Sequence, residues 1–420
     1  MKSQHYTKIL MPLLVILLIA LTIFFIAIYC DIFDEFGAIA KRRLIEYPII
    51  TFFVTPLFFW VSAFLCRKFS PNAAGHNLQT AIEVLKENPN NFSKISPYMN
   101  FRLVLVKALS SAFSSFGGGS LGKEGPSVHM SAAIFTIFAN RYKKFLEKIN
   151  LEAWLFAGCA LGLTIAFNAP IAGVVFASEK LSKFGFKTFR KNIFWVLIII
   201  AITTLLFARH NSFFNFNEVA FSLESGMLKA LIITTLICGF VAVIVKRASY
   251  YFLFKISGIE SNYWHLIPIT AGFVVAYINF YSGIYSFGGS ILSIQETLSN
   301  NFTSLSYREV GARIVNTIIT FASGSAGGLI APAMAIGTGI GSVMSSLLGN
   351  ADLGAYLLFG MVAFLSVIVG EPIAAAVIVF ETTGQNITAL PFLLTASFIA
   401  FGILKGIARV NAPKDLSEII

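Results

Sequence analysis

Charged residues are scarce in this chain: 12% of its 420 residues are Asp, Glu, Lys or Arg, whereas soluble domains contain about 25%. Hydrophobic residues make up 56%. This balance excludes a soluble globular protein and predicts an integral membrane protein surrounded by the lipid bilayer. The net charge of +11 does not indicate nucleic acid binding, because the basic residues cluster at the ends of apolar segments, where cytoplasmic flanks are expected.

Cysteine is scarce as well. The four cysteines lie in apolar surroundings, and their spacing is not typical of a metal site. They are Cys30, Cys66, Cys159 and Cys238. We predict that they are buried and act as small hydrophobic side chains, and we expect neither a metal nor a cofactor.

Long uninterrupted apolar runs are also few. A straight span needs about 20 apolar residues, and several segments are shorter or broken by Gly or Pro. The segments comprise residues 9–30, 47–66, 101–116, 153–178, 192–208, 227–245, 266–281, 354–369 and 390–404. Broken segments at membrane depth must be covered by protein or water, so we predict an all-α polytopic bundle of tilted and discontinuous helices. The first segment is too long for a signal peptide and lacks a cleavage site, so we expect a retained span.

One acidic residue, Glu124, interrupts this apolar sequence within Gly122-Lys123-Glu124-Gly125-Pro126. Gly and Pro are expected to end one helix there and to start another. A carboxylate at membrane depth is costly and by default indicates a functional site. A helix N-terminus binds anions through its unpaired N–H groups and its dipole. We therefore predict that Glu124 occupies an anion's place and leaves it when protonated or displaced, as a gate does. The alternative is a structural carboxylate paired with Lys123.

The chain contains an internal repeat. Residues 170–179 and 372–381 both open with Pro-Ile-Ala and end with Glu, and each stretch follows a Gly-x-x-x-Pro break. The breaks, at residues 122–126 and 328–332, precede the repeats by 44 (170 − 126) and 40 (372 − 332) positions. Paired breaks in two halves point to the midplane site of a transporter. We expect the site where the two breaks converge.

These motifs resemble those of the CLC family of chloride channels and chloride/proton antiporters. The stretch around Glu124 resembles the family's Gly-(Lys/Arg)-Glu-Gly signature, and residues 328–332, Gly-Leu-Ile-Ala-Pro, resemble its Gly-x-Phe-x-Pro signature. Residues 71–76, Pro-Asn-Ala-Ala-Gly-His, fall where the family has its first anion-coordinating loop. The similarity runs from about residue 50 to residue 405.

The resemblance implies a single CLC-type transmembrane domain over residues 1–420, built as an inverted repeat with halves at about 50–205 and 225–405. It also implies a homodimer without cytoplasmic regulatory domains, in a bacterial inner membrane. Chloride or another small anion would bind at helix N-termini, and Glu124 would be the outer gate and proton carrier. The backbone of seven residues would face the anion: Gly75, His76, Asn77, Gly125, Pro126, Ile330 and Ala331.

Three positions depart from the family's anion site. His76 takes the place of a serine hydroxyl that donates to the anion, and Ile330 takes the place of a phenylalanine. The pore tyrosine has no counterpart, since no Tyr follows Tyr356, and Asn411 or Ala412 falls nearest to its place.

A fourth departure concerns protons. The family's internal proton-transfer glutamate aligns with Lys180, next to Glu179. A proton route would need Glu179, water or Lys180 for its inner half. The simpler interpretation is that Lys180 is a solvated helix-end lysine, and that Glu179 and Glu381 are salt-bridged structural carboxylates.

Three alternatives to chloride/proton antiport stay open. A passive chloride channel is favoured by Lys180 and the absent tyrosine, and a fluoride/proton antiporter by His76-Asn77-Leu78. Residues 118–122 also fit Gly-x-Ser-x-Gly, which would suggest an intramembrane serine hydrolase using Ser120. That motif needs a catalytic triad, and no His and Asp pair accompanies it, so we expect a transporter and not an enzyme.

Overall fold

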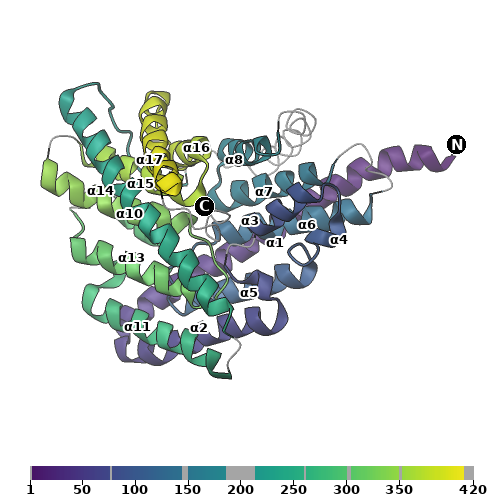
Figure 1. Ribbon diagram of the computed structural model, residues 1–420, viewed down its shortest axis with the longest axis horizontal. Coiled ribbons are helices and arrows are strands. Elements are labelled where there is room, and N and C mark those ends of the chain that lie inside the picture. The colour runs from purple at the N-terminus through teal and green to yellow at the C-terminus, as the bar shows by residue number, and fades with distance from the viewer. Residues whose placement is uncertain are drawn as a thin grey trace.

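The computed structural model describes residues 2–75, 78–143, 150–185, 213–259, 262–299, 304–349 and 352–410, and its regular elements in these ranges are helices (Figure 1). The helices are α1 (Lys2–Glu46), α2 (Pro48–Phe69), α3 (Leu78–Glu87), α4 (Phe92–Ile95), α5 (Phe101–Phe116), α6 (Glu124–Arg141), α7 (Leu151–Phe167), α8 (Pro170–Ser182), α10 (Ser225–Ser257), α11 (Leu266–Ser282), α12 (Ser290–Thr297), α13 (Tyr307–Ala322), α14 (Ile330–Leu348), α15 (Leu353–Val369), α16 (Pro372–Thr383) and α17 (Leu390–Val410). Four short 3₁₀ turns are η1 (Pro71–Ala73), η2 (Asn262–His265), η3 (Ile284–Ser286) and η4 (Ile387–Ala389).

Six helical stretches of the described residues are long and apolar enough to cross a membrane. They are Met11–Glu46, Pro48–Phe69, Ser225–Ile256, Asn262–Ser282, Ile330–Leu348 and Ile387–Ile407. Three shorter apolar helices, α7, α15 and α16, lie among them. This mixture of full and short helices agrees with the predicted bundle, although the predicted segment 192–208 lies outside the described residues.

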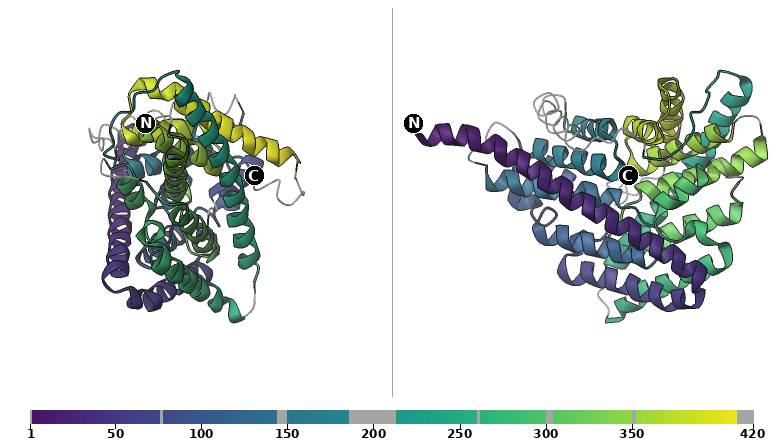
Figure 2. Two further views of the ribbon diagram at one scale, coloured as in Figure 1. Left: turned by 90° about the vertical axis from the view of Figure 1, so that its left-hand side faces the viewer. Right: turned by 180° about the vertical axis from the view of Figure 1, so that it is seen from behind.

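Two predicted segments differ from the helices observed. Residues 153–178 form α7 and α8, because Asn168 adopts a left-handed conformation (φ 51°, ψ 38°) that ends α7 and Pro170 starts α8. The first segment does not end near residue 30 but continues as a helix to Glu46. Some charged residues of this extension pair with other side chains, as in the contact of Lys41 with Glu296 at 3.1 Å. Figure 2 shows α1 running obliquely along one side of the molecule.

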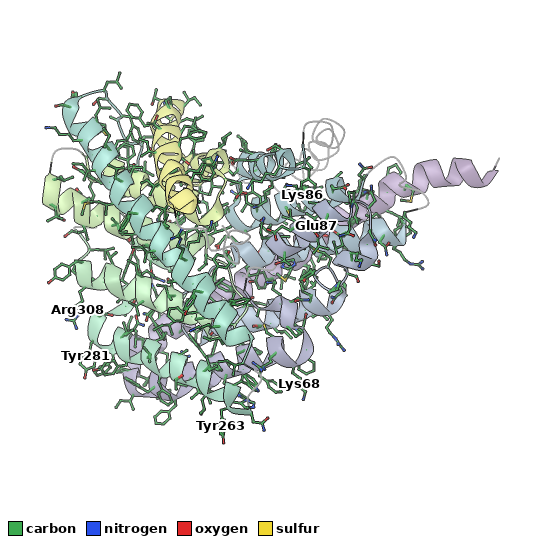
Figure 3. The ribbon with its side chains drawn as sticks, viewed as in Figure 1. Lys68, Lys86, Glu87, Tyr263, Tyr281 and Arg308 are labelled. Carbon is green, nitrogen blue, oxygen red and sulfur yellow. The ribbon has the colours of Figure 1, made fainter. Side chains whose placement is uncertain are left out.

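The outer faces of the bundle are apolar, whereas polar groups gather at its ends. Ile49 and Phe53 of α2 are 72% and 71% exposed, which is expected of a face that contacts lipid. Figure 3 shows Lys68, Tyr263 and Arg308 at the outer edge of the ribbon. Basic and aromatic side chains are typical of the membrane–water interface.

The core contains two pairs of closely packed helices, α6 with α7 and α14 with α15. A Cβ atom added at Gly162 of α7 would lie 2.4 Å from the carbonyl oxygen of Ser127. A Cβ added at Gly360 of α15 would lie 2.1 Å from the carbonyl oxygen of Gly337. Small residues permit such close approach of backbones, which is how helices associate inside membranes.

Replacement of Gly360 by alanine is therefore expected to destabilise the protein by about 1–3 kcal/mol or more, because the new methyl group meets a backbone carbonyl that cannot move alone. Gly402 of α17 is the matched control, since a Cβ there meets nothing within 4 Å. Gly402→Ala should leave stability equal or slightly higher. Thermal unfolding in detergent, followed by size-exclusion chromatography, measures both. Equal melting temperatures for the two variants would contradict the packing described.

Two glutamates show how the repeats meet. The Glu381 carboxylate accepts hydrogen bonds from the backbone N–H groups of Ile171 (3.1 Å) and Ala172 (2.7 Å) in the first turn of α8. Glu179 in turn accepts from the first turn of α16, where its nearest donor is Ala374 N at 2.8 Å. Reciprocal contacts of this kind are the mark of a twofold relation.

The interpretation of Glu179 and Glu381 as salt-bridged carboxylates is thus wrong. Their hydrogen-bond partners are helix N-termini, which attract negative charge through the helix dipole. The boundaries of the halves, about 50–205 and 225–405, stay a prediction, because residues 186–212 lie outside the described part of the chain.

Candidate functional site

Three chain breaks meet at the centre of the fold. Gly122 and Gly328 form an antiparallel bridge, and each N–H donates to the other residue's carbonyl oxygen at 2.9 Å. Gly75 forms a parallel bridge with Ala326. The predicted convergence of the two Gly-x-x-x-Pro breaks is confirmed, and the first loop joins them.

Glycine is required where the breaks touch. A Cβ atom at Gly328 would lie 2.8 Å from the backbone nitrogen of Gly125 and 3.0 Å from its Cα. Both neighbours are backbone atoms, so neither can rotate away as a side chain would. The sequence therefore brings the starts of α6 and α14 into direct contact.

Helix N-termini converge on this junction. Helix α6 begins at Glu124 and α14 at Ile330, two positions after the bridged glycines Gly122 and Gly328. The first N–H groups of a helix have no partner within the helix, and the helix dipole adds about half a positive charge there. The junction is thus an electropositive site made of backbone, without the need for a cationic side chain.

The Glu124 carboxylate lies in this electropositive site. The side chain is completely buried, and its Oε2 accepts a hydrogen bond from the Ala331 N–H at 3.3 Å. Its Oε1 has no hydrogen-bond partner in the described part of the chain. A buried carboxylate oxygen without a partner costs about 1–3 kcal/mol or more. Glu124 is therefore held at the start of α14 by few interactions, as a group that must leave easily would be.

Lys123 does not neutralise Glu124 by pairing with it. Its ammonium group instead forms an ion pair with the carboxylate of Asp34 on α1. The alternative in which Glu124 is simply the ion-pair partner of Lys123 is therefore wrong. The Lys123–Asp34 pair ties the start of α6 to α1, and sequence reasoning missed it because 89 positions separate the two residues.

Lys107 is a second group that the sequence did not single out. It lies on α5, is 1% exposed, and its Nζ donates to the carbonyl oxygen of Gly75 at 3.2 Å. In the described residues it forms no ion pair with a carboxylate. A buried ammonium without a counter-ion favours a nearby anion, and this one contacts the first loop at Gly75.

Ser120 is a structural residue. Its hydroxyl accepts from Arg313 Nη1 at 3.1 Å and lies 2.7 Å from the Thr317 hydroxyl. Neither a histidine nor a carboxylate contacts it among the described residues, so the serine hydrolase alternative has no triad to support it. Arg313, itself fully buried, also bonds Ser293 at 2.5 Å. It thereby connects the loop before α6 to the start of α12.

Lys180 is neither solvated nor at an exposed helix end. It is 6% exposed, and its Nζ lies 2.9 Å from Oε1 of Glu371. Lys183 reaches the same oxygen at 2.6 Å. The interpretation of Lys180 as a solvated helix-end lysine is wrong, because the Glu371 carboxylate, 191 positions away in the chain, is its buried partner.

The remaining predicted residues are accounted for as follows. Gly125, Pro126, Ile330 and Ala331 lie at the junction of α6 and α14 and are buried. His76 and Asn77 lie outside the described residues, as do Asn411 and Ala412. All four cysteines are free and buried, as predicted.

Comparisons with known proteins agree with this architecture. The sequence profile of the family described as voltage gated chloride channel matches residues 57–405. The H(+)/Cl(-) exchange transporter ClcA of Citrobacter koseri is 27% identical over 374 residues, which cover 85% of this chain and 76% of the relative. The ClcA protein of Klebsiella pneumoniae is 27% identical over 376 residues with the same coverage.

Solved structures show the same fold. A slow cyanobacterial Cl⁻/H⁺ antiporter superposes with a TM-score of 0.74 and 19% identity, covering 94% of this chain and 93% of the other. A CLC-type fluoride/proton antiporter superposes with a TM-score of 0.75 and 20% identity, covering 94% and 95%. The predicted all-helical CLC-type membrane fold is confirmed. The chain belongs to the family of voltage-gated chloride channels, the CLC family, and is a multi-pass membrane protein for CLC-type anion transport, not an enzyme.

Proposed function

We propose that this protein exchanges chloride for protons across a membrane and that Glu124 is the group shared by the two ions. The observation that carries the proposal is the position of the Glu124 carboxylate, which is buried and bonded through one oxygen to the start of α14. The relatives described as H(+)/Cl(-) exchange transporters support it.

The anion site consists of backbone donors. The first turns of α6 and α14 offer N–H groups at Gly125, Ile330 and Ala331, and Gly75 and its neighbours His76 and Asn77 are proposed to complete the site. Each helix terminus stabilises an anion by about 0.3–2 kcal/mol, more when it is buried. Lys107 adds a positive charge behind Gly75.

The gate works by competition for these donors. An ionised Glu124 and a chloride ion are both monovalent anions, and both seek the Ala331 N–H. When Glu124 takes up one proton it becomes neutral and releases the donor, and chloride can then enter. When chloride leaves, the neutral carboxylic acid gives up its proton, and the carboxylate that results returns to the Ala331 N–H. Each exchange moves one proton with the carboxyl group, so the anion flux and the proton flux are coupled.

Two other functions remain as outcomes of the test. A passive chloride channel would keep the gate without moving protons through the protein. Fluoride/proton antiport is the activity named for one structural neighbour, which is 20% identical, and His76-Asn77-Leu78 is the feature of this chain that favours it.

A proteoliposome assay distinguishes the three functions. The purified protein is reconstituted, the membrane potential is clamped with potassium and valinomycin, and a chloride gradient is imposed while internal pH is recorded. Proton movement against its own gradient establishes antiport. Chloride flux without coupled protons identifies a passive channel and overturns the proposal. Replacing chloride by fluoride in the same assay shows which halide drives protons, and protein-free liposomes are the control.

We also propose that the protein is a homodimer. Ile171 of α8 and Ile373 of α16 are 58% and 43% exposed, and they lie in first turns that the reciprocal glutamates bring to the same region. A second copy is proposed to cover this apolar face. Cross-linking of an Ile373→Cys variant in the membrane tests it, and a purely monomeric product would contradict it.

A further inference from the structure

Glu371 is one of the most deeply buried charged groups of the described residues outside the junction of α6 and α14. It immediately precedes α16 and is 1% exposed. Its Oε1 is contacted by two ammonium groups, from Lys180 of α8 at 2.9 Å and from Lys183, the residue directly after α8, at 2.6 Å. Two ammonium groups and one carboxylate leave this triad with a net charge of +1.

Further titratable groups surround the triad. On α10, Lys246 is 7% exposed and donates to the carbonyl oxygen of Val367 at 3.1 Å, and both Lys246 and Tyr250 interact electrostatically with Glu371. On α8, Glu179 interacts electrostatically with Glu371, although its carboxylate caps α16. The site is thus a carboxylate amid cations contributed by two helices.

Helix α10 also connects this cluster with the central loops. Tyr250 packs edge-on against Phe321 at the end of α13, with 5.7 Å between the ring centroids. One turn further along α10, Leu253 lies against Gly75, where an added Cβ would meet its Cδ2 at 2.5 Å. The cluster and the first loop of the anion site are therefore reached from neighbouring turns of one helix.

The second oxygen of Glu371 is buried and lacks a partner. Although Oε1 receives both lysines, Oε2 has no hydrogen-bond partner among the described residues. Glu124 has the same arrangement, with one bonded oxygen and one without a partner. A purely structural ion pair would be expected to use both oxygens, because leaving one unsatisfied costs about 1–3 kcal/mol.

We propose that Glu371 is the proton-binding group on the Lys180 side of the transport cycle, with Lys183 as its connection to water. This proposal rests on the proposed antiport. The resemblance to the CLC family places a carboxylate at position 180, and here a lysine stands there while the carboxylate comes from Glu371, the residue before α16.

Proton loading can be written in balanced form. The Lys183 side chain is 52% exposed, so its ammonium group contacts water while it bonds Oε1. A hydronium ion in the water beside Lys183 transfers one proton to the Glu371 carboxylate and leaves as a water molecule, while Lys183 keeps its own charge. The net result is one proton on Glu371, and the charge of the triad rises from +1 to +2. Release of that proton toward Glu124 restores the carboxylate and the charge of +1.

Glu371→Gln tests the proposal, because the amide keeps the size of the side chain but cannot carry a proton. In the proteoliposome assay, the coupled proton flux should fall by about 100-fold, the scale of a lost proton-transfer group, while chloride still crosses. Glu371→Asp should keep part of the coupling. Glu381→Gln is the matched control, since Glu381 of α16 also reaches α8 but contacts no lysine among the described residues.

Moving the carboxylate separates a proton role from a structural one. In Glu371→Gln combined with Lys180→Glu, the carboxylate lies on α8 and Lys183 stays nearby, so coupling should return. Wild-type coupling in Glu371→Gln would overturn the proposal while leaving antiport intact. Failure of coupling to return in a double variant that still conducts chloride would also overturn it. If the wild-type protein moves no coupled protons, the proposed antiport fails first, and the role of Glu371 fails with it.

Discussion

Glutamine in place of Glu124 is expected to decrease the coupled proton flux by at least about 100-fold. The variant should still fold. The amide is nearly the same size and can still accept the Ala331 N–H that now lies 3.3 Å from Oε2. The amide does not ionise, so it cannot alternate between a bound anion and a released neutral acid. Proton uptake under a chloride gradient measures the effect.

Alanine at the same position should have a different effect on chloride. Without a tethered carboxylate, the N–H groups at the start of α14 are available to chloride at every pH. Wild-type chloride flux should rise as pH falls, because protonation releases Glu124, whereas flux in Glu124→Ala should be nearly independent of pH. Radioactive chloride efflux between pH 4 and pH 8 would show a slope for the wild type and a flat line for the variant.

A matched control is available at another helix start. Glu309 lies in the first turn of α13, where it forms a capping box with Ser306, but it is outside the central junction. Glu309→Gln should leave both coupling and pH dependence unchanged. Persistent proton pumping by Glu124→Ala would rule out Glu124 as the proton carrier and the gate.

The features of this site that could be predicted from the sequence are those that depend only on residues close together in the chain. Gly and Pro mark the helix breaks, and their repetition at residues 122–126 and 328–332 predicted that the two breaks meet. Glu124 was recognised because a carboxylate within an apolar stretch is conspicuous on its own. The glycine contacts of Gly122 and Gly328 confirm that these residues fix the backbone of the junction.

The parts that could not be predicted depend on partners distant in sequence. Lys180 was interpreted as solvated because its own helix offers no counter-ion, and Glu371 lies 191 positions away. Lys107 was not noticed because its helix fits an apolar span, and its partner is a backbone carbonyl without a sequence signal. Helix periodicity states which residues share a face but not which helix packs there, so buried pairs of this kind need the structure.

Alanine in place of Gly122 should weaken chloride binding while the protein stays folded. A Cβ there would lie 2.1 Å from Oε2 of Glu124, 3.1 Å from the Cβ of Ala331 and 3.3 Å from its nitrogen. The Glu124 carboxylate is the end of a flexible side chain and can move aside. The new methyl group then occupies the place of the carboxylate and covers the Ala331 N–H. Chloride loses this donor, at a cost of about 1.5–3 kcal/mol for a hydrogen bond to a charged group.

The loss of one such donor corresponds to about a tenfold or larger decrease in chloride affinity, since 1.4 kcal/mol is a factor of ten. Isothermal titration calorimetry with chloride measures it, and Gly311→Ala is the control because a Cβ at Gly311 meets nothing within 4 Å. Gly328→Ala should behave differently from Gly122→Ala. Its Cβ would meet the backbone of Gly125, so this variant is expected to lose the folded junction and not only the anion.

Combining Gly122→Ala with Glu124→Ala identifies which group obstructs the anion. If the methyl group itself covers the Ala331 N–H, removal of the carboxylate cannot restore the site, and chloride affinity stays low in the double variant. If chloride binding instead returns to the level of Glu124→Ala alone, the anion does not use the Ala331 N–H, which lies next to Gly122. The Glu124 carboxylate and chloride would then bind at different sites. The competition that is proposed to couple protons to chloride would lose its structural basis.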